Sequence, residues 1–199
     1  MVLQPQYRGS TGWGLDHYKS AFIPKGQGGY SMQDDLDDGA KYLVDKGWVD
    51  PDRIAMFGWS YGGYAALVAA SRSPQINQCV IAGAAVADTN QQVNYYRFRT
   101  RGTQKIEQLN MWDDSISPIE EVAKVNVPML IIHGDNDQRV PFKHFKKYTA
   151  ALDKHHKNYQ TVVMHGADHF FDTWTYDHKN QFYPKLLDFL KNDCGPGGL

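Results

Sequence analysis

One six-residue segment constrains this chain more than any other. The segment Gly58–Gly63 reads GWSYGG and follows the short apolar run Arg53–Phe57. That run is β-prone and ends at a glycine, so it predicts a buried strand, whereas the alanine-rich segment Tyr64–Ala70 predicts a helix. A Gly-x-Ser-x-Gly sequence between a strand and a helix is typical of a nucleophile elbow, a turn so tight that it favours glycine two residues before and two after the serine. The pattern predicts that Ser60 stands above the sheet at the positive end of the helix and acts as a nucleophile.

A serine nucleophile needs a base to take its proton, and the base needs an orienting carboxylate. In α/β-hydrolases the acid and then the histidine follow the serine in chain order, in loops after later strands. The first loop of this kind contains Asp135 and Asp137, and spacing leaves the two carboxylates equal. The second contains His165 and His169. Position favours His169, because it lies deeper in a glycine-containing loop, from which a side chain can turn toward Ser60.

The other histidines and the acidic cluster are predicted to have structural or solvated roles. We expect His133 to be a structural residue at a strand end. The acidic run over residues 34–38 predicts a solvated helix start rather than a metal site, because nothing nearby supplies a second group of ligands. Histidines on helix surfaces are commonly solvated, and this is expected for His144, His155, His156 and His178.

Strands and helices are predicted to alternate along the chain. A strand at Val2–Pro5 is followed by a glycine-containing loop and by a helix over Met32–Lys46, with Ser31 as its N-cap. Further strands are expected at Arg53–Phe57, Cys79–Ala84, Val127–Ile132 and Gln160–Met164, with helices between them and a last amphipathic helix near Asn180–Lys191. This alternation predicts an α/β fold with a mostly parallel sheet that helices cover on both faces.

Composition indicates one enzyme domain and excludes two other classes of protein. The chain has 199 residues and 42% hydrophobic content, enough for one domain with a sizeable core. Its net charge of −1, with scattered lysines and arginines, provides no field for nucleic acid. No stretch approaches the length of a membrane-spanning helix, and the start lacks the charged and apolar regions of a signal peptide. The compartment therefore stays open between periplasmic or secreted and cytoplasmic.

Several segments that span nearly the whole chain form a more specific pattern. They are Val2–Gly14, Asp50–Tyr64, Ser117-Pro118, His133-Gly134-x-x-Asp137-x-x-Val140 and Asp168-His169-Phe170. In this order they resemble the catalytic domain of the prolyl oligopeptidase family of serine peptidases, which includes dipeptidyl peptidase IV and the acylaminoacyl-peptidases. The resemblance implies an α/β-hydrolase fold and hydrolysis of peptide bonds, in short peptides, through a Ser-Asp-His triad and an acyl-enzyme. Such a mechanism needs no metal or organic cofactor.

The resemblance also implies roles for individual residues. In the family pattern His-Gly-x-x-Asp the catalytic acid is the aspartate four residues after the histidine, which is Asp137 here and not Asp135. The family's histidine falls on His169. The backbone N–H of Tyr61 then receives negative charge from the tetrahedral oxygen, as one donor of the oxyanion hole.

The substrate pocket follows from the same resemblance. It implies that the pocket for the substrate residue before the cleaved bond is bordered by Tyr61, Val86, Tyr96 and Val140. Arg139 resembles the acylaminoacyl-peptidase branch. A tight proline slot is not expected, because Thr89 and Gln92 stand where dipeptidyl peptidase IV has aromatic residues. Packing of a helix by aromatic side chains, Tyr96 among them, is the alternative.

Two cysteines, Cys79 and Cys194, fall close to positions that form a disulfide in dipeptidyl peptidase IV. There the bridge joins a core strand to the last helix. The same bridge here would imply an oxidising compartment. An ordinary buried thiol at Cys79 is the alternative.

One expected part of the oxyanion hole has no counterpart in the sequence. Its second donor usually comes from a loop after an early strand, often within a His-Gly-Gly segment, and none precedes Ser60. We therefore expect Met1–Leu199 to be the carboxyl-terminal part of a longer α/β-hydrolase that lacks its first strands and the β-propeller of the family. An unpaired edge at Val2–Pro5 would then favour association into a homo-oligomer.

Two other functions are compatible with this fold. A carboxylesterase or lipase would use the same triad, but a lipase usually has an apolar lid, and the stretch over residues 84–117 is polar and charged. A hydrolase-fold binding module without activity would have lost triad members, and all three are present. The sequence therefore favours a serine peptidase.

Overall fold

The computed structural model describes residues 1–22, 26–103, 109, 112 and 114–199. The chain divides into two compact units, Met1–Asp50 with Asp88–Ser117 and Pro51–Ala87 with Pro118–Leu199. Part of the stretch that argued against a lipase lies outside the described residues. The sheet and all three residues of the predicted triad belong to the second unit.

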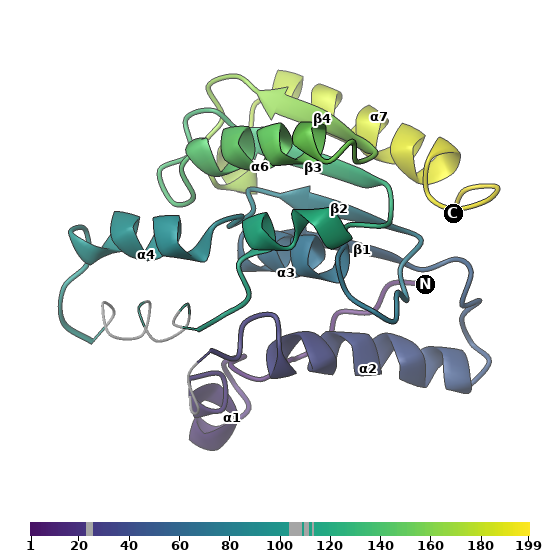
Figure 1. The fold of residues 1–199 in the computed structure, drawn as a ribbon, viewed down its shortest axis with the longest axis horizontal. Helices are drawn as coiled ribbons and strands as arrows, with labels where there is room; N and C mark the ends of the chain where they lie inside the picture. Colours follow the sequence, from purple (N-terminus) through teal and green to yellow (C-terminus); the bar gives the residue numbers. More distant parts are fainter. Residues whose placement is uncertain (23–25, 104–108, 110–111, 113) are drawn as a thin grey trace. The chain divides into compact units, whose positions relative to one another are not determined.

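The second unit is built on a four-stranded parallel sheet. Its strands are β1 (Ala55–Trp59), β2 (Cys79–Gly83), β3 (Met129–Gly134) and β4 (Tyr159–Met164). They lie side by side in the order β1-β2-β3-β4, and every neighbouring pair is parallel (Figure 1). The predicted parallel sheet is confirmed. Its first strand is shifted by two residues because pairing continues to Trp59, opposite Gly83.

Helices cover both faces of this sheet. They are α3 (Tyr61–Ala69), α6 (Lys143–Lys154) and α7 (Tyr176–Asn192), with short 3-10 turns at η1 (Pro118–Glu120), η2 (Val122–Lys124) and η3 (Phe171–Thr173). Alternate residues of β2 and β3 enter two separate cores, as the pleat of a strand requires. One core contains Val80, Ala82, Met129 and Ile131 with side chains of α3 and α6. The other contains Ile81, Leu130 and Ile132 with Phe182 and Phe189 of α7.

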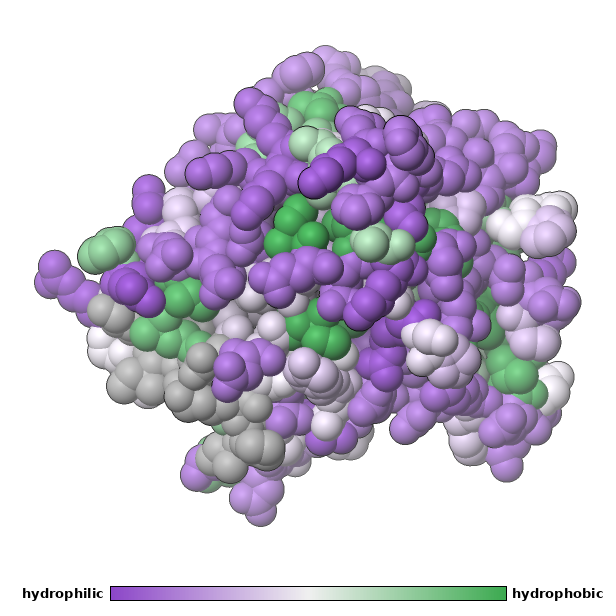
Figure 2. Space-filling view, viewed as in Figure 1, coloured by the Kyte–Doolittle hydropathy of each residue, from purple (hydrophilic) through white to green (hydrophobic). Residues whose placement is uncertain are grey.

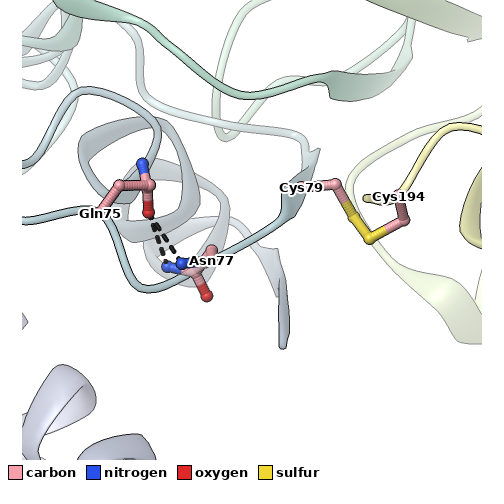
Figure 3. The surroundings of a disulfide bond; sticks show 4 residues. All are labelled: Gln75, Asn77, Cys79 and Cys194. Carbon is pink, nitrogen blue, oxygen red and sulfur yellow. Dashed lines mark hydrogen bonds between the residues drawn. A yellow bond between two sulfur atoms is a disulfide. The ribbon is translucent and has the colours of Figure 1, made fainter. Parts of the chain in front are cut away.

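A disulfide joins the sheet to the segment that follows α7. It links Cys79, the first residue of β2, to Cys194, the pair named from the family resemblance (Figure 3). Just before β2, the side-chain oxygen of Gln75 accepts a 2.9 Å hydrogen bond from the backbone N–H of Asn77, which shapes the entry into the strand. Both sulfurs belong to the second unit, so the bridge ties together distant parts of one compact body.

The first unit contains α1 (Leu15–Lys19), α2 (Ser31–Asp45) and α4 (Thr89–Arg97). The strand predicted at Val2–Pro5 is wrong: this segment has no regular structure. A strand needs a partner for its backbone groups, and Pro5 has no N–H to donate. Leu3 and Pro5 instead lie against Gly39 of α2, where a Cβ would approach the Leu3 side chain to 3.2 Å. The edge strand on which self-association was expected is therefore not present in this segment.

One prediction about α2 is also wrong, and a second holds only for the exposed Asp34 and Asp38. Ser31 is the first helical residue and not the N-cap, because the backbone N–H groups of Gln33 and Asp34 already reach the carbonyl of Tyr30. The acidic start is not simply solvated either. Asp35 accepts two 2.7 Å hydrogen bonds from the guanidinium of Arg8, and these hold the pKa of Asp35 below its usual range.

The prediction of a solvated His144 is wrong. His144 lies on the inner face of α6, and its side chain is fully buried. Its Nδ1 accepts a hydrogen bond from the backbone N–H of Ala87 at 3.3 Å, so the buried ring carries a neutral, hydrogen-bonded nitrogen there. A histidine can occupy a helix face that packs on a sheet when the sheet side supplies a partner of this kind.

The molecular surface visible in Figure 2 is largely hydrophilic, with hydrophobic side chains in small separate patches. In the part of the chain that the structure describes, none of the helices combines the length and hydropathy that crossing a membrane would require.

Candidate active site

The backbone at Ser60 has the conformation of a strained elbow. Ser60 joins the end of β1 to the start of α3 with φ 61° and ψ −114°, which L-residues rarely adopt. Its N–H donates to the carbonyl of Gly83 at 2.9 Å, and its own carbonyl accepts from Tyr64 at 3.0 Å. Holding a non-glycine residue in such a region costs about 1–3 kcal/mol, which the surrounding packing must offset. These two bonds fix the turn between the sheet and the helix.

Two glycines of the elbow are required by close backbone contacts, and one is not. A Cβ on Gly58 would overlap the backbone of Gly62, and a Cβ on Gly63 would overlap the carbonyl of Gly83. A Cβ on Gly62 would meet nothing within 4 Å. The expectation that glycine is needed sterically two residues after the serine is therefore wrong for this chain. The close contact of Gly62 is the one between its backbone and the position of a Cβ on Gly58.

The loops after β3 and β4 bring a carboxylate and an imidazole together. Asp137 Oδ2 and His169 Nδ1 are 2.7 Å apart, and both side chains are almost completely buried. Because a carboxylate accepts, Nδ1 of His169 carries the proton. The other ring nitrogen, Nε2, then has a lone pair and can act as a base.

The carboxylate of Asp137 is surrounded by donors. Its Oδ1 accepts from the backbone N–H of Arg139 at 2.8 Å and of Val140 at 2.9 Å. On the other oxygen, His133 Nε2 lies 3.5 Å from Oδ2. Burial by itself raises the pKa of this carboxyl, but the bonds from His133, His169 and Val140 together outweigh burial and hold its pKa far below the usual range. Asp137 is therefore a fixed negative charge beside His169.

The structure contains a second Asp–His pair, made of the two residues that sequence reasoning left as alternatives. Asp135 Oδ2 lies 2.8 Å from His165 Nδ1, and its Oδ1 accepts from the backbone of Gly166 at 2.7 Å. The His165 side chain is 83% exposed, however, whereas the His169 side chain is 9% exposed. An exposed pair is screened by water and interacts weakly. Burial therefore distinguishes the two pairs where spacing did not.

A direct contact connects the Ser60 elbow to the His169 loop. The indole Nε1–H of Trp59, the residue before Ser60, donates to the backbone oxygen of His169 at 2.9 Å. The last residue of β1 thus holds the loop that carries the buried imidazole.

The predicted pocket residues fall in different places. Val86 and Val140 are both buried, and the backbone of Val140 is bound on one side to Asp137 and on the other to His133. Arg139 is exposed, and its guanidinium lies 5.7 Å from the ring centre of Phe170, next to His169. Tyr96 belongs to α4 of the first unit, where its ring packs edge-to-face on Tyr95.

Sequence reasoning missed the contacts that His133 and Trp59 make in this arrangement. His133 was expected only to be structural. It donates through Nε2 to the carbonyl of Val140 at 2.9 Å and lies 3.5 Å from Oδ2 of Asp137, and its spacing of four residues before Asp137 was a usable signal. For Trp59 the signal was chemical, because an indole N–H at the end of a buried strand usually finds an acceptor. Among the described residues no group of His, Cys, Asp or Glu side chains is arranged to hold a metal ion.

These features define a class of protein. A parallel sheet covered by helices, a serine on a strained strand-to-helix turn, and an Asp–His pair after the following strands together define an α/β-hydrolase. The sequence profile of the prolyl oligopeptidase family matches residues 1–197, and the chain belongs to that family.

Individual relatives agree with this placement. Dipeptidyl peptidase family member 6 of Caenorhabditis elegans is 31% identical over 166 residues, which cover 78% of this chain and 22% of that protein. Prolyl endopeptidase FAP of Mus musculus is 28% identical over 165 residues, covering 82% of this chain and 21% of its own. The structure of Pyrococcus horikoshii acylaminoacyl peptidase superposes with a TM-score of 0.79 at 20% identity, over 94% of this chain and 31% of that one. The chain thus spans about a fifth of the length of these curated relatives.

Proposed function

We propose that this chain carries the catalytic residues of a serine peptidase that cleaves short peptides, with Ser60 as nucleophile, His169 as base and Asp137 as the orienting acid. The observation that carries the proposal is the buried 2.7 Å contact between Asp137 and His169. It fixes the tautomer of the imidazole and leaves Nε2 as an acceptor for a serine proton. Membership of the prolyl oligopeptidase family supports the choice of peptide bonds as substrate.

The reaction then proceeds in two halves. His169 Nε2 removes the proton from Ser60 Oγ as the oxygen attacks the peptide carbonyl, and the fixed charge of Asp137 stabilises the imidazolium that forms. The N–H of Tyr61, the first residue of α3, receives the developing negative charge at the positive end of that helix. His169 next protonates the leaving amine, which departs. Water, deprotonated by the same imidazole, releases the acyl group from Ser60.

Substrate contacts are part of the same proposal. Val86 and Val140 would form an apolar wall for the side chain before the cut, and the exposed Arg139 would face polar groups of the peptide. The relatives with dipeptidyl peptidase or acylaminoacyl peptidase in their names differ in the amino end of the substrate, so a series of free and blocked peptides would locate this enzyme among them.

The experiment that tests the proposal replaces Ser60 by alanine. Ser60→Ala should abolish hydrolysis of short peptide p-nitroanilides and covalent labelling by a fluorophosphonate. Ser71→Ala is the matched control, because Ser71 lies just after the same helix and only its hydroxyl bond to the carbonyl of Val68 is lost. Retained labelling in Ser60→Ala would refute the nucleophile, and hydrolysis of p-nitrophenyl esters without any peptide cleavage would refute the peptidase assignment.

A further inference from the structure

The indole of Trp59 occupies a position that the triad alone does not explain. Trp59 ends β1 and directly precedes Ser60. Its Nε1–H donates to the backbone oxygen of His169, 110 residues later in the chain, at 2.9 Å. One side chain therefore contacts the backbone of the base while its own backbone continues into the nucleophile.

The indole itself is held on several sides. Its ring lies 4.5 Å from Phe171 and 5.1 Å from Trp174, centre to centre, and these two rings lie 4.3 Å from each other. Both residues follow His169 closely, in and just after η3. On the side of the sheet, a Cβ on Gly83 would overlap the Trp59 ring, so only glycine fits there. The indole is fixed between β2 and the segment that continues the His169 loop.

We propose that Trp59 is a positioning residue, which sets the place of the His169 imidazole relative to Ser60 through the backbone of His169. The proposal rests on the function assigned above to Ser60 and His169. The hydrogen bond to Asp137 fixes the orientation of the His169 ring at Nδ1. It does not fix the backbone of His169, and the ring moves whenever that backbone moves. The bond from Trp59 anchors that backbone to the strand that carries Ser60. Catalytic groups must be held within about 0.5 Å of productive geometry, and an error near 1 Å can cost about a hundredfold in rate.

Trp174 provides a matched comparison inside the same cluster. It packs edge-on against Trp59 and is buried, whereas Trp59 is half-buried. Its indole Nε1 is buried and has no acceptor within the residues described. Replacing Trp174 by phenylalanine therefore changes the aromatic packing next to His169 but removes no hydrogen bond to the His169 backbone.

The test compares Trp59→Phe with Trp174→Phe in the full chain. We expect Trp59→Phe to lower kcat and the rate of fluorophosphonate labelling about tenfold to a hundredfold, with KM changed less than about threefold. Trp174→Phe should change both rates less than about threefold. Equal labelling rates in the two variants would overturn the proposal, because packing alone would then account for the effect.

Two further measurements keep the proposal testable if Trp59→Phe is poorly folded. Benzothienylalanine at position 59 keeps the shape of the indole and replaces only its N–H, so it should reproduce the loss of rate; a wild-type rate would refute the proposal. By proton NMR, the downfield signal of the His169 Nδ1–H, assigned by its loss in His169→Gln, should broaden or shift in the position-59 variants and persist unchanged in Trp174→Phe. An unchanged signal at position 59 would also refute it. This NMR signal does not depend on Ser60, and it therefore tests the position of the His169 ring independently of the reaction. The assignment of Ser60 as nucleophile is tested separately, and it would fail if labelling persisted in Ser60→Ala.

Discussion

His133 Nε2 lies 2.9 Å from the carbonyl of Val140 and 3.5 Å from Asp137 Oδ2, so a buried imidazole supports the acid of the proposed triad from the strand itself. Because a carbonyl only accepts, Nε2 must carry the proton. The rings of Phe142 and Phe145 pack edge-on against His133 and hold it in place. Two imidazoles from different parts of the chain thus lie against the same oxygen of Asp137, Oδ2.

We expect His133→Phe to weaken both the fold and the site. Phenylalanine preserves the aromatic packing but leaves the buried carbonyl of Val140 without its donor, which costs about 1–3 kcal/mol of unfolding free energy. Turnover should fall as well, because Asp137 loses a donor. Urea unfolding and peptide hydrolysis measure the two effects. His155→Phe, at an exposed position after α6, should stay within about 0.5 kcal/mol of the wild type; an equal loss in both variants would contradict the role of His133.

Replacing each aspartate of the two Asp–His pairs distinguishes the buried pair, proposed to be catalytic, from the exposed one. Asp137→Asn should lower the rate of hydrolysis about a thousandfold to ten-thousandfold, because an amide no longer fixes the imidazole tautomer. Asp135→Asn should leave the rate within about twofold, because its pair with His165 is exposed. Kinetics with a short peptide substrate measure both. If Asp135→Asn were the more damaging change, the assignment of the acid would be reversed.

Stability should depend on pH through Asp137. The folded pKa of this carboxyl is far below its unfolded value of about 3.9, so between the two values the unfolded chain binds more protons. The contribution of Asp137 is therefore complete above about pH 4 and is lost as the pH falls further toward the folded pKa. We expect Asp137→Asn to show a flatter decline of unfolding free energy below pH 4, by up to about 1.4 kcal/mol per pH unit. Parallel curves for the two proteins in denaturant titrations would argue against the depressed pKa.

The elbow glycines should differ sharply in their tolerance of alanine. Gly58→Ala and Gly63→Ala should prevent stable folding, because each new Cβ would overlap backbone atoms that cannot move independently. Gly62→Ala should fold at least as well as the wild type, since its Cβ has open space and alanine in a helix is favoured over glycine by about 1 kcal/mol. Thermal unfolding of the three variants ranks them, and an unstable Gly62→Ala would show that this steric account is incomplete.

Removing the disulfide should cost stability without affecting the site directly. Cys79 and Cys194 are 115 residues apart, and closing a loop of that length in the unfolded chain is worth about 4–5 kcal/mol. The double variant Cys79→Ala with Cys194→Ala should lose an amount of this order in chemical denaturation. A thiol titration of the unfolded, non-reduced protein should find no reactive thiol. Two reactive thiols would exclude the bridge.

Much of the fold followed from local sequence. The apolar runs that became β2, β3 and β4 were predicted to within one or two residues, because each is short, apolar and bounded by turn residues. Two of the failures share one cause. Val2–Pro5 has a β-prone sequence but no strand to pair with, and His144 is a polar residue on a helix whose inward face was not known. Pairing and burial both depend on neighbours that are distant in sequence.

The position of Ser60 on a turn between a strand and a helix could be predicted from the amino-acid sequence alone, because the glycines and the flanking propensities act over a few residues. Tertiary contacts determine which of the two Asp–His pairs is buried, and how β1 is connected to the loop that carries His169. Asp135 and Asp137 differ by two positions in one loop, so local sequence does not distinguish them, whereas in the folded chain water is excluded from the Asp137–His169 pair and reaches the Asp135–His165 pair. The bond from Trp59 to His169 spans 110 residues, and no local pattern encodes a contact of that range.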